Sequence, residues 1–172
     1  QSTDGSTLEG LHAQGYVYEV YVAGRDLGQT IEEFQSITCI KDGLNLPQDF
    51  EKFFSFDRSP EQKYLISNVT EAGLVWSQEG SKGQIANSFP GRITQWLYTR
   101  FEQAPELETI LLPCELIPNN GDFLKSLIQQ HALAWNLDVE FLNWINLNCC
   151  FHNTLVDRIV PGFPKQLAEK AA

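Results

Sequence analysis

An adjacent acid and base, Asp157 and Arg158, stand inside the apolar run at residues 153–160 (NTLVDRIV), which stops at Pro161-Gly162. In a β-strand, successive side chains point to opposite faces, so each charge would lie between aliphatic neighbours on its own face. A buried charge costs several kcal/mol unless it is paired, so both groups need a partner or a ligand. The alternative is an edge strand in which the two charges meet water or form one cross-strand ion pair.

Two further polar segments follow short apolar runs. Residues 68–74 (NVTEAGL) follow the run at 64–68, and residues 114–121 (CELIPNNG) follow the run at 109–114. In open α/β sheets, ligands bind beyond the carboxyl ends of the strands, which places both segments where a site is expected. Glu71 and Glu115 also have a structural interpretation, because a Glu after a strand commonly enters or caps a helix. As a carboxylate pair they would fit a glycosidase, but closing a (β/α)₈ barrel takes about 250 residues.

The elements that would position these residues follow from the apolar periodicity. Strands are expected at residues 15–22, 36–40, 64–68 and 109–114, with the segment at 153–160 as another. Helices are expected at 47–56, 90–103, 122–135 and 139–145, the third capped by Asp122, whereas residues 1–14 are expected to form a loop with at most one helical turn. Strands alternating with helices from residue 47 onward predict an α/β fold with parallel strands. The first two strands, joined by a long connection that begins with a turn at 24–28, predict an antiparallel pair inserted at the sheet edge.

Composition sets the outer limits on function. The 172 residues carry a formal net charge of −10, which argues against nucleic acid and anionic membranes as partners, because both attract basic surfaces. No apolar run approaches the roughly 20 residues that a membrane helix needs. The four cysteines and three histidines show no metal-ligand spacing, so we expect no metal site. Reduced thiols in a cytoplasmic protein are the expected state of the cysteines.

Three segments together resemble the polyol-specific long-chain dehydrogenases, the mannitol dehydrogenase family. Residues 153–159 are similar to that family's N-(S/T)-x-V-D-R-I signature. Residues 70–73 resemble its T-E-x-G segment, and residues 114–117 with Asn120-Gly121 resemble its C-(D/E)-x-(L/I)…N-G segment. The three motifs occur in the family's order, and the resemblance covers nearly the whole chain, most weakly over the first sixty residues.

The resemblance implies that residues 1–172 are a partial N-terminal NAD-binding domain. Its fold would be α/β and Rossmann-like, with a mostly parallel sheet and the antiparallel pair as an edge insertion. NAD would be the cofactor, and a small sugar acid would be the substrate. The site residues carried over from the motifs are Asn68, Thr70 and Glu71 for the cofactor, Glu115, Asn120, Asn153 and Asp157 for the substrate, and Asp157 as the catalytic candidate.

The substrate expectation depends on Leu116. One branch of the family carries Asn at this position, two residues after the Cys, where it helps to hold the substrate oxygen. Leu116 therefore favours a sugar acid such as altronate over mannitol. Mannitol, mannonate with its keto form fructuronate, and other polyols are the alternative substrates within the same family. A non-catalytic α/β binding domain is the alternative from another class.

Two parts of the family's machinery have no match in the chain. No G-x-G-x-x-G motif occurs, and the resemblance places the glycine-containing turn that cradles the pyrophosphate before Gln1. It places the general base, a lysine, in a separate helical domain after Ala172, so that domain is the expected partner. We therefore expect the chain to be a fragment that catalyses nothing by itself.

Overall fold

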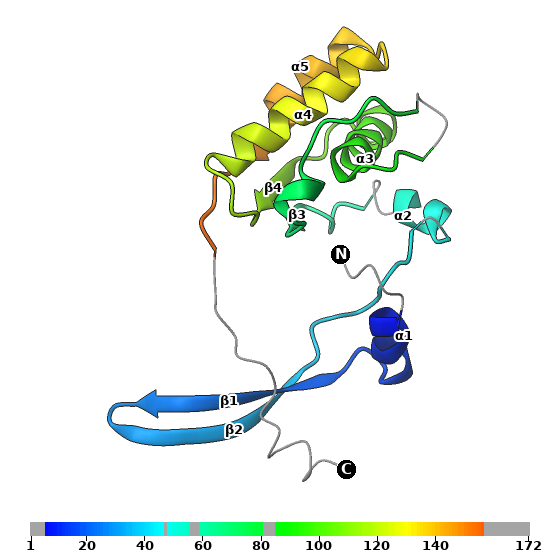
Figure 1. Ribbon diagram of the computed structural model, residues 1–172. Helices are drawn as coiled ribbons and strands as arrows, with labels where there is room; N and C mark the ends of the chain where they lie inside the picture. The colour runs from blue at the N-terminus through cyan, green and yellow to red at the C-terminus, as the bar shows by residue number, and fades with distance from the viewer. Residues whose placement is uncertain (1–5, 47, 56–58, 81–84, 157–172) are drawn as a thin grey trace. The chain divides into compact units, whose positions relative to one another are not determined.

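The chain divides into two compact units, Gln1–Ser59 and Pro60–Ala172 (Figure 1). The structure, a computed structural model, describes residues 6–46, 48–55, 59–80 and 85–156. Within these residues, no helix is both long and apolar enough to cross a membrane.

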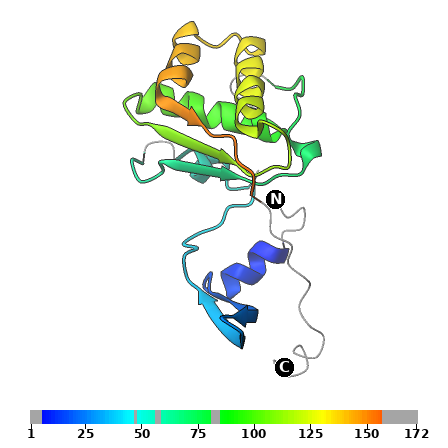
Figure 2. The ribbon, with the colours of Figure 1, turned by 90° about the vertical axis from the view of Figure 1, so that its left-hand side faces the viewer.

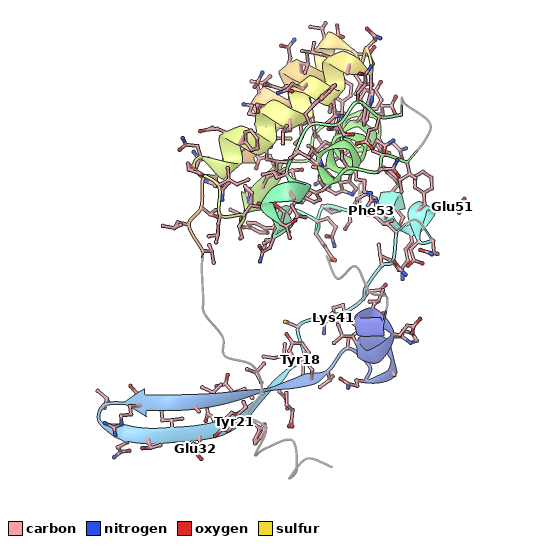
Figure 3. The ribbon with its side chains drawn as sticks, in the orientation of Figure 1. Tyr18, Tyr21, Glu32, Lys41, Glu51 and Phe53 are labelled. Atoms are coloured by element: carbon pink, nitrogen blue, oxygen red, sulfur yellow. The ribbon has the colours of Figure 1, made fainter. Side chains whose placement is uncertain are left out.

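The first unit is built around a hairpin of two long antiparallel strands. Its elements are α1 (Ser6–Ala13), β1 (Tyr18–Asp26), β2 (Gln29–Ile37) and α2 (Phe50–Ser55). The strands pair from Tyr18 opposite Ile37 to Asp26 opposite Gln29. The Tyr21 and Phe34 rings, which face each other across the ladder, lie 5.1 Å apart between centroids. Figure 3 labels Tyr18 and Tyr21 on β1 and Glu32 on β2.

The hairpin confirms the predicted antiparallel pair but corrects its boundaries. The connection is a two-residue turn, Leu27-Gly28, and not a long loop that begins at Gly24. Both turn residues have positive φ, 48° and 84°, as in a type I′ turn, whose twist matches that of the flanking strands. That match lets β1 continue through Gly24 to Asp26.

One other expectation for the first unit was wrong, and a second is confirmed over part of its range. Residues 6–13, expected to be mainly a loop, form the helix α1. The helix expected at 47–56 is described only over Phe50–Ser55, and none of its residues is buried. Its Phe53 ring (labelled in Figure 3) packs edge-to-face on Phe54, with 5.2 Å between ring centroids, so the aromatic side chains contact one another without forming a core.

The second unit is a three-stranded parallel sheet covered by helices. Its elements are β3 (Tyr64–Ser67), the 3₁₀ turn η2 (Glu71–Gly73), α3 (Phe89–Gln103), β4 (Thr109–Pro113), α4 (Asn120–Ala134), α5 (Val139–Asn148) and β5 (Cys149–Phe151). The strand order is β3-β4-β5, with both pairings parallel. Figure 2 shows α3, α4 and α5 on the same side of this sheet. The α/β, Rossmann-like fold is therefore present in this unit.

The core lies between the sheet and its helices. Alternate β4 residues, Thr109, Leu111 and Pro113, are buried, as expected where one strand face packs on helices. The largest fully buried apolar side chains come from β4, the helices and the segment after η2; they are Leu74, Leu97, Leu111, Leu124, Ile128, Phe141 and Ile145. Ser88 caps α3 by accepting the Gly91 N–H at 3.0 Å.

The third strand of the sheet is not where the sequence predicted it. Ile66 and Leu111 lie on neighbouring strands as expected, but the next strand is Cys149–Phe151, so the prediction of a strand around Val156 was wrong. Residues 152–156 are not in a strand, and residues 157–160, including Asp157 and Arg158, lie outside the described residues. Because α5 continues to Asn148 and the strand starts at once, the pairing with β4 is complete before the apolar run at 153–160 begins.

The start of α4 also differs from the prediction. The helix begins at Asn120, after Asn119 in the left-handed conformation (φ 53°), and the Asn119 side chain does not cap it. Asp122, expected to be the cap, lies instead in the first turn of the helix.

Candidate functional site

The three motif segments meet at one edge of the parallel sheet. Because β3, β4 and β5 are parallel, the segments that follow them all leave from the carboxyl edge, where open α/β sheets bind ligands. The first two segments are joined directly, since the Cys114 N–H donates to the Ser67 carbonyl at 2.7 Å. The candidate site is therefore this edge, formed by residues 68–73, 114–120 and 152–156.

Glu115 turns its carboxylate toward the end of β3. The residue is only 3% exposed. Its Oε1 accepts the Val69 N–H at 3.0 Å, and its Oε2 accepts the Ser67 hydroxyl at 3.2 Å. The carboxylate therefore links two segments that are 46 or more residues apart in the chain.

Asn120 joins the end of β4 to the segment after β5. Its side chain is fully buried, and its Nδ2 donates to the carbonyl oxygens of Pro113 (2.8 Å), Glu115 (3.0 Å) and Thr154 (3.0 Å). Its Oδ1 accepts the Thr154 N–H at 2.9 Å. The Thr154 hydroxyl also donates to the Pro113 carbonyl. The Asn120 amide is thus occupied on both its donor and its acceptor side by the chain itself.

Asn153 fastens the same segment to the first turn of α4. Its Oδ1 accepts the Asp122 N–H at 3.1 Å, and its Nδ2 donates to the Asp122 carboxylate at 2.8 Å. Gly121 permits this approach, because a Cβ at Gly121 would lie 2.5 Å from the His152 carbonyl oxygen. The chain after β5 therefore crosses the start of α4 in backbone contact.

The segment after β3 presents its polar side chains outward. Val69 is buried, whereas Asn68 and Thr70 on either side of it are exposed. The Gly73 N–H donates to the Thr70 carbonyl at 2.7 Å, which closes the η2 turn. The backbone of Glu71 lies in this turn, but its side chain is outside what the structure describes.

The structure therefore brings most of the predicted site residues to one edge of the sheet. Asn68 and Thr70 are exposed there, while Glu115, Asn120 and Asn153 bind other parts of the chain. Sequence reasoning assigned no role to three residues that build the edge, Ser67, Gly121 and Thr154, although Gly121 and Thr154 stand within the quoted motifs. Of the three, Gly121 could most easily have been noticed, because a glycine directly before an expected helix can indicate a close backbone contact.

The first unit also contains a hollow. It has a volume of about 450 Å³ and is lined by residues of α1, of the segment before α2 and of α2 itself. In the lining of this hollow, the Lys52 ammonium group pairs with the Asp42 carboxylate at 2.5 Å. This bond from Lys52 holds the pKa of Asp42 below its usual value, so the two charges already satisfy each other. Among the described residues, no group of three or more His, Cys, Asp or Glu could hold a metal ion.

A buried histidine lies in the helical layer, away from these segments. His131 is fully buried between the rings of Trp76 and Trp135, with centroids at 6.4 and 5.1 Å, and neither ring nitrogen has a hydrogen-bond partner among the described residues. Burial lowers the pKa of His131, although the Glu79 carboxylate acts in the opposite direction. Burial therefore favours the neutral form of the imidazole.

Comparison with known proteins gives one family over almost the whole chain. The mannitol dehydrogenase Rossmann domain matches residues 6–172. The altronate oxidoreductase of Halalkalibacterium halodurans is 37% identical over 96% of this chain, and that of Bacteroides thetaiotaomicron is 38% identical over 96%. The chain spans only 33% and 36% of the lengths of these two relatives.

Solved structures of similar fold lie further away in sequence. Pseudomonas fluorescens mannitol 2-dehydrogenase, solved as a ternary complex with NAD and D-mannitol, aligns with a TM-score of 0.73 at 21% identity over 99% of this chain. D-sorbitol dehydrogenase in its substrate-free form aligns with a TM-score of 0.76, also at 21% identity. At this identity the likeness concerns the fold alone.

Proposed function

The chain belongs to the mannitol dehydrogenase family, and we propose that it is the NAD-binding part of an oxidoreductase that interconverts the sugar acid altronate and its keto form, tagaturonate. The observation that carries this proposal is the 37–38% identity with altronate oxidoreductases over 96% of the chain. Both relatives are about three times as long as this chain, so the complete reaction is proposed for the full-length protein.

The carboxyl edge of the parallel sheet is where this chain would hold the dinucleotide. Asn68 and Thr70 offer exposed side chains at the end of β3, next to the turn that follows β4. Their position, beyond the strand ends of a Rossmann-like sheet, fits a dinucleotide lying across that edge. NAD would supply the hydride acceptor there.

The described residues of this chain would hold the site in shape and would not themselves carry out the chemical step. Glu115, Asn120 and Asn153 hold the three segments together through bonds within the chain, so their part in the site is to fix its shape. A fixed edge lowers the barrier because reacting groups need near-attack geometry before hydride transfer. The residue proposed to contact the substrate is Asp157, three residues beyond Thr154. By the family resemblance, the lysine that takes the substrate's hydroxyl proton lies outside these 172 residues.

The glycosidase alternative loses its main support. It required Glu115 as a free carboxylate, but that carboxylate is buried and already accepts two hydrogen bonds. A sugar-acid substrate is favoured over mannitol because Leu116, 54% exposed beside the site, offers no amide to a substrate hydroxyl.

The test uses the full-length protein. Titration with NADH, followed by the fluorescence of the nicotinamide, should show saturable binding. Absorbance at 340 nm should then rise with NAD and altronate and fall with NADH and tagaturonate. Mannitol and mannonate in the same assay provide the substrate comparison. Turnover of mannitol in preference to altronate would contradict the substrate assignment, and the absence of NADH binding would contradict the function as a whole.

A further inference from the structure

Glu115 is a buried carboxylate in an unusual setting. Among the described residues no ion pair involves it, and its two hydrogen-bond donors, the Val69 N–H and the Ser67 hydroxyl, are uncharged. Burying a carboxylate without a cation is costly, and an uncharged side chain would pack at lower cost. A residue that served stability alone would therefore more economically be apolar or an amide.

We propose that Glu115 is a positioning residue for the dinucleotide, an inference that rests on the proposed function. Its carboxylate does not contact the cofactor. It fixes the backbone at Val69 through a charge-assisted hydrogen bond, which is stronger than a bond between neutral groups. Because Val69 points inward, its two neighbours are set outward on the cofactor side of the edge.

The main chain that carries the Glu115 carboxylate is itself held in place. The Glu115 carbonyl accepts a hydrogen bond from Asn120, which in turn holds Thr154, so the main chain of Glu115 is fixed from the far side. The carboxylate then reaches back to the end of β3. Holding the segment after β3 before the ligand arrives reduces the ordering cost of binding, so loss of the carboxylate weakens affinity without removing any direct contact.

Three variants in the full-length protein separate this role from a general contribution to stability. Glu115→Ala removes both bonds. Glu115→Gln keeps both, because the amide oxygen can accept the Val69 N–H while the amide nitrogen donates to the Ser67 oxygen. Ser67→Ala removes only the hydroxyl. Glu106→Ala, at an exposed residue before β4, is the matched control for loss of a carboxylate.

The measurements are the NADH dissociation constant at 25 °C, KM for NAD and for altronate, kcat, the melting temperature, and hydrogen exchange at the Val69 amide. Glu115→Ala should weaken NADH binding and lower kcat on the order of tenfold to a hundredfold, as when a positioning residue is lost. KM for altronate should stay near that of the wild type, and the Val69 amide should exchange faster. Glu115→Gln, which keeps both bonds but loses the charge, should recover only part of the lost NADH affinity, and Ser67→Ala should lie between Glu115→Ala and the wild type.

If the wild type binds NADH and Glu115→Ala binds it equally well, only the positioning role is overturned, even if the melting temperature falls. If the wild type binds no dinucleotide, the proposed function fails and the positioning role fails with it. Should Glu115→Ala not fold, the inference is overturned when Ser67→Ala leaves both Val69 exchange and NADH affinity unchanged.

Discussion

Replacing Gly121 by Ala would test whether backbone contact between α4 and the segment after β5 builds the site. The added methyl carbon would lie 2.5 Å from the His152 carbonyl oxygen, 2.6 Å from its carbon and 3.0 Å from the Asn153 nitrogen. All three are backbone atoms, so no side chain can rotate away. The segment must therefore move off the helix.

The cost follows from the atoms involved. Overpacking of this kind costs about 1–3 kcal/mol. Displacing the segment also strains the two bonds between Asn153 and Asp122, each contributing about 1 kcal/mol. Against this, Ala is better than Gly in a helix by at most about 1 kcal/mol. The net expectation is a loss of about 2–4 kcal/mol in the free energy of unfolding.

Urea unfolding followed by tryptophan fluorescence measures this loss. All four tryptophans, Trp76, Trp96, Trp135 and Trp144, belong to the second unit, so the signal reports on the unit that contains Gly121. Gly10→Ala is the control, because Gly10 lies in α1 of the first unit with no heavy atom within 4 Å of the added carbon. It should leave the tryptophan transition unchanged. A Gly121→Ala variant as stable as the wild type would refute the proposed contact.

Four further outcomes are expected. Asn120→Ala should lower the free energy of unfolding by about 2–5 kcal/mol in urea titrations, because three carbonyl groups lose a buried donor, and Asn120→Asp should be no better because a carboxylate donates nothing to them. Burial lowers the pKa of His131 in the folded state, so the stability that the neutral imidazole contributes is present above its ordinary pKa of 6.5 and is lost as the pH falls through the lowered pKa. The melting temperature should therefore fall as the pH is lowered from 7.5 to 5, and His131→Leu should make it depend less on pH. Burial raises the pKa of the Cys149 thiol to about 12, so only roughly one Cys149 thiol in 10⁴ is ionised at pH 8. Alkylation at pH 8 followed by mass spectrometry should therefore label the exposed Cys150 and leave Cys149 unmodified. Asp157→Ala in the full-length protein should lower turnover steeply at an unchanged melting temperature, whereas a large fall in melting temperature with normal kinetics would assign Asp157 to a structural ion pair.

Local pattern determined the second unit's main elements. The apolar runs at 64–68 and 109–114 predicted β3 and β4, and the apolar spacing from Ile93 to Phe101 predicted α3, because these patterns reflect which residues of each element pack on a core. The resemblance of three short motifs to one family also came from sequence alone. From the parallel order of strands it followed that the polar segments after them belong to one edge.

Tertiary structure decided where the third strand begins and which way the site's polar groups turn. The run at 153–160 has the composition of a strand, yet β4 pairs with residues 149–151, since the end of α5 sets where the chain meets the sheet. Glu115 and Asn120 looked like candidates to touch a ligand, but their bonds to Val69 and Thr154 span 46 and 34 residues. Contacts between residues so far apart do not change the spacing of apolar residues in either segment. Only the folded chain therefore shows that these side chains hold the segments of the site together.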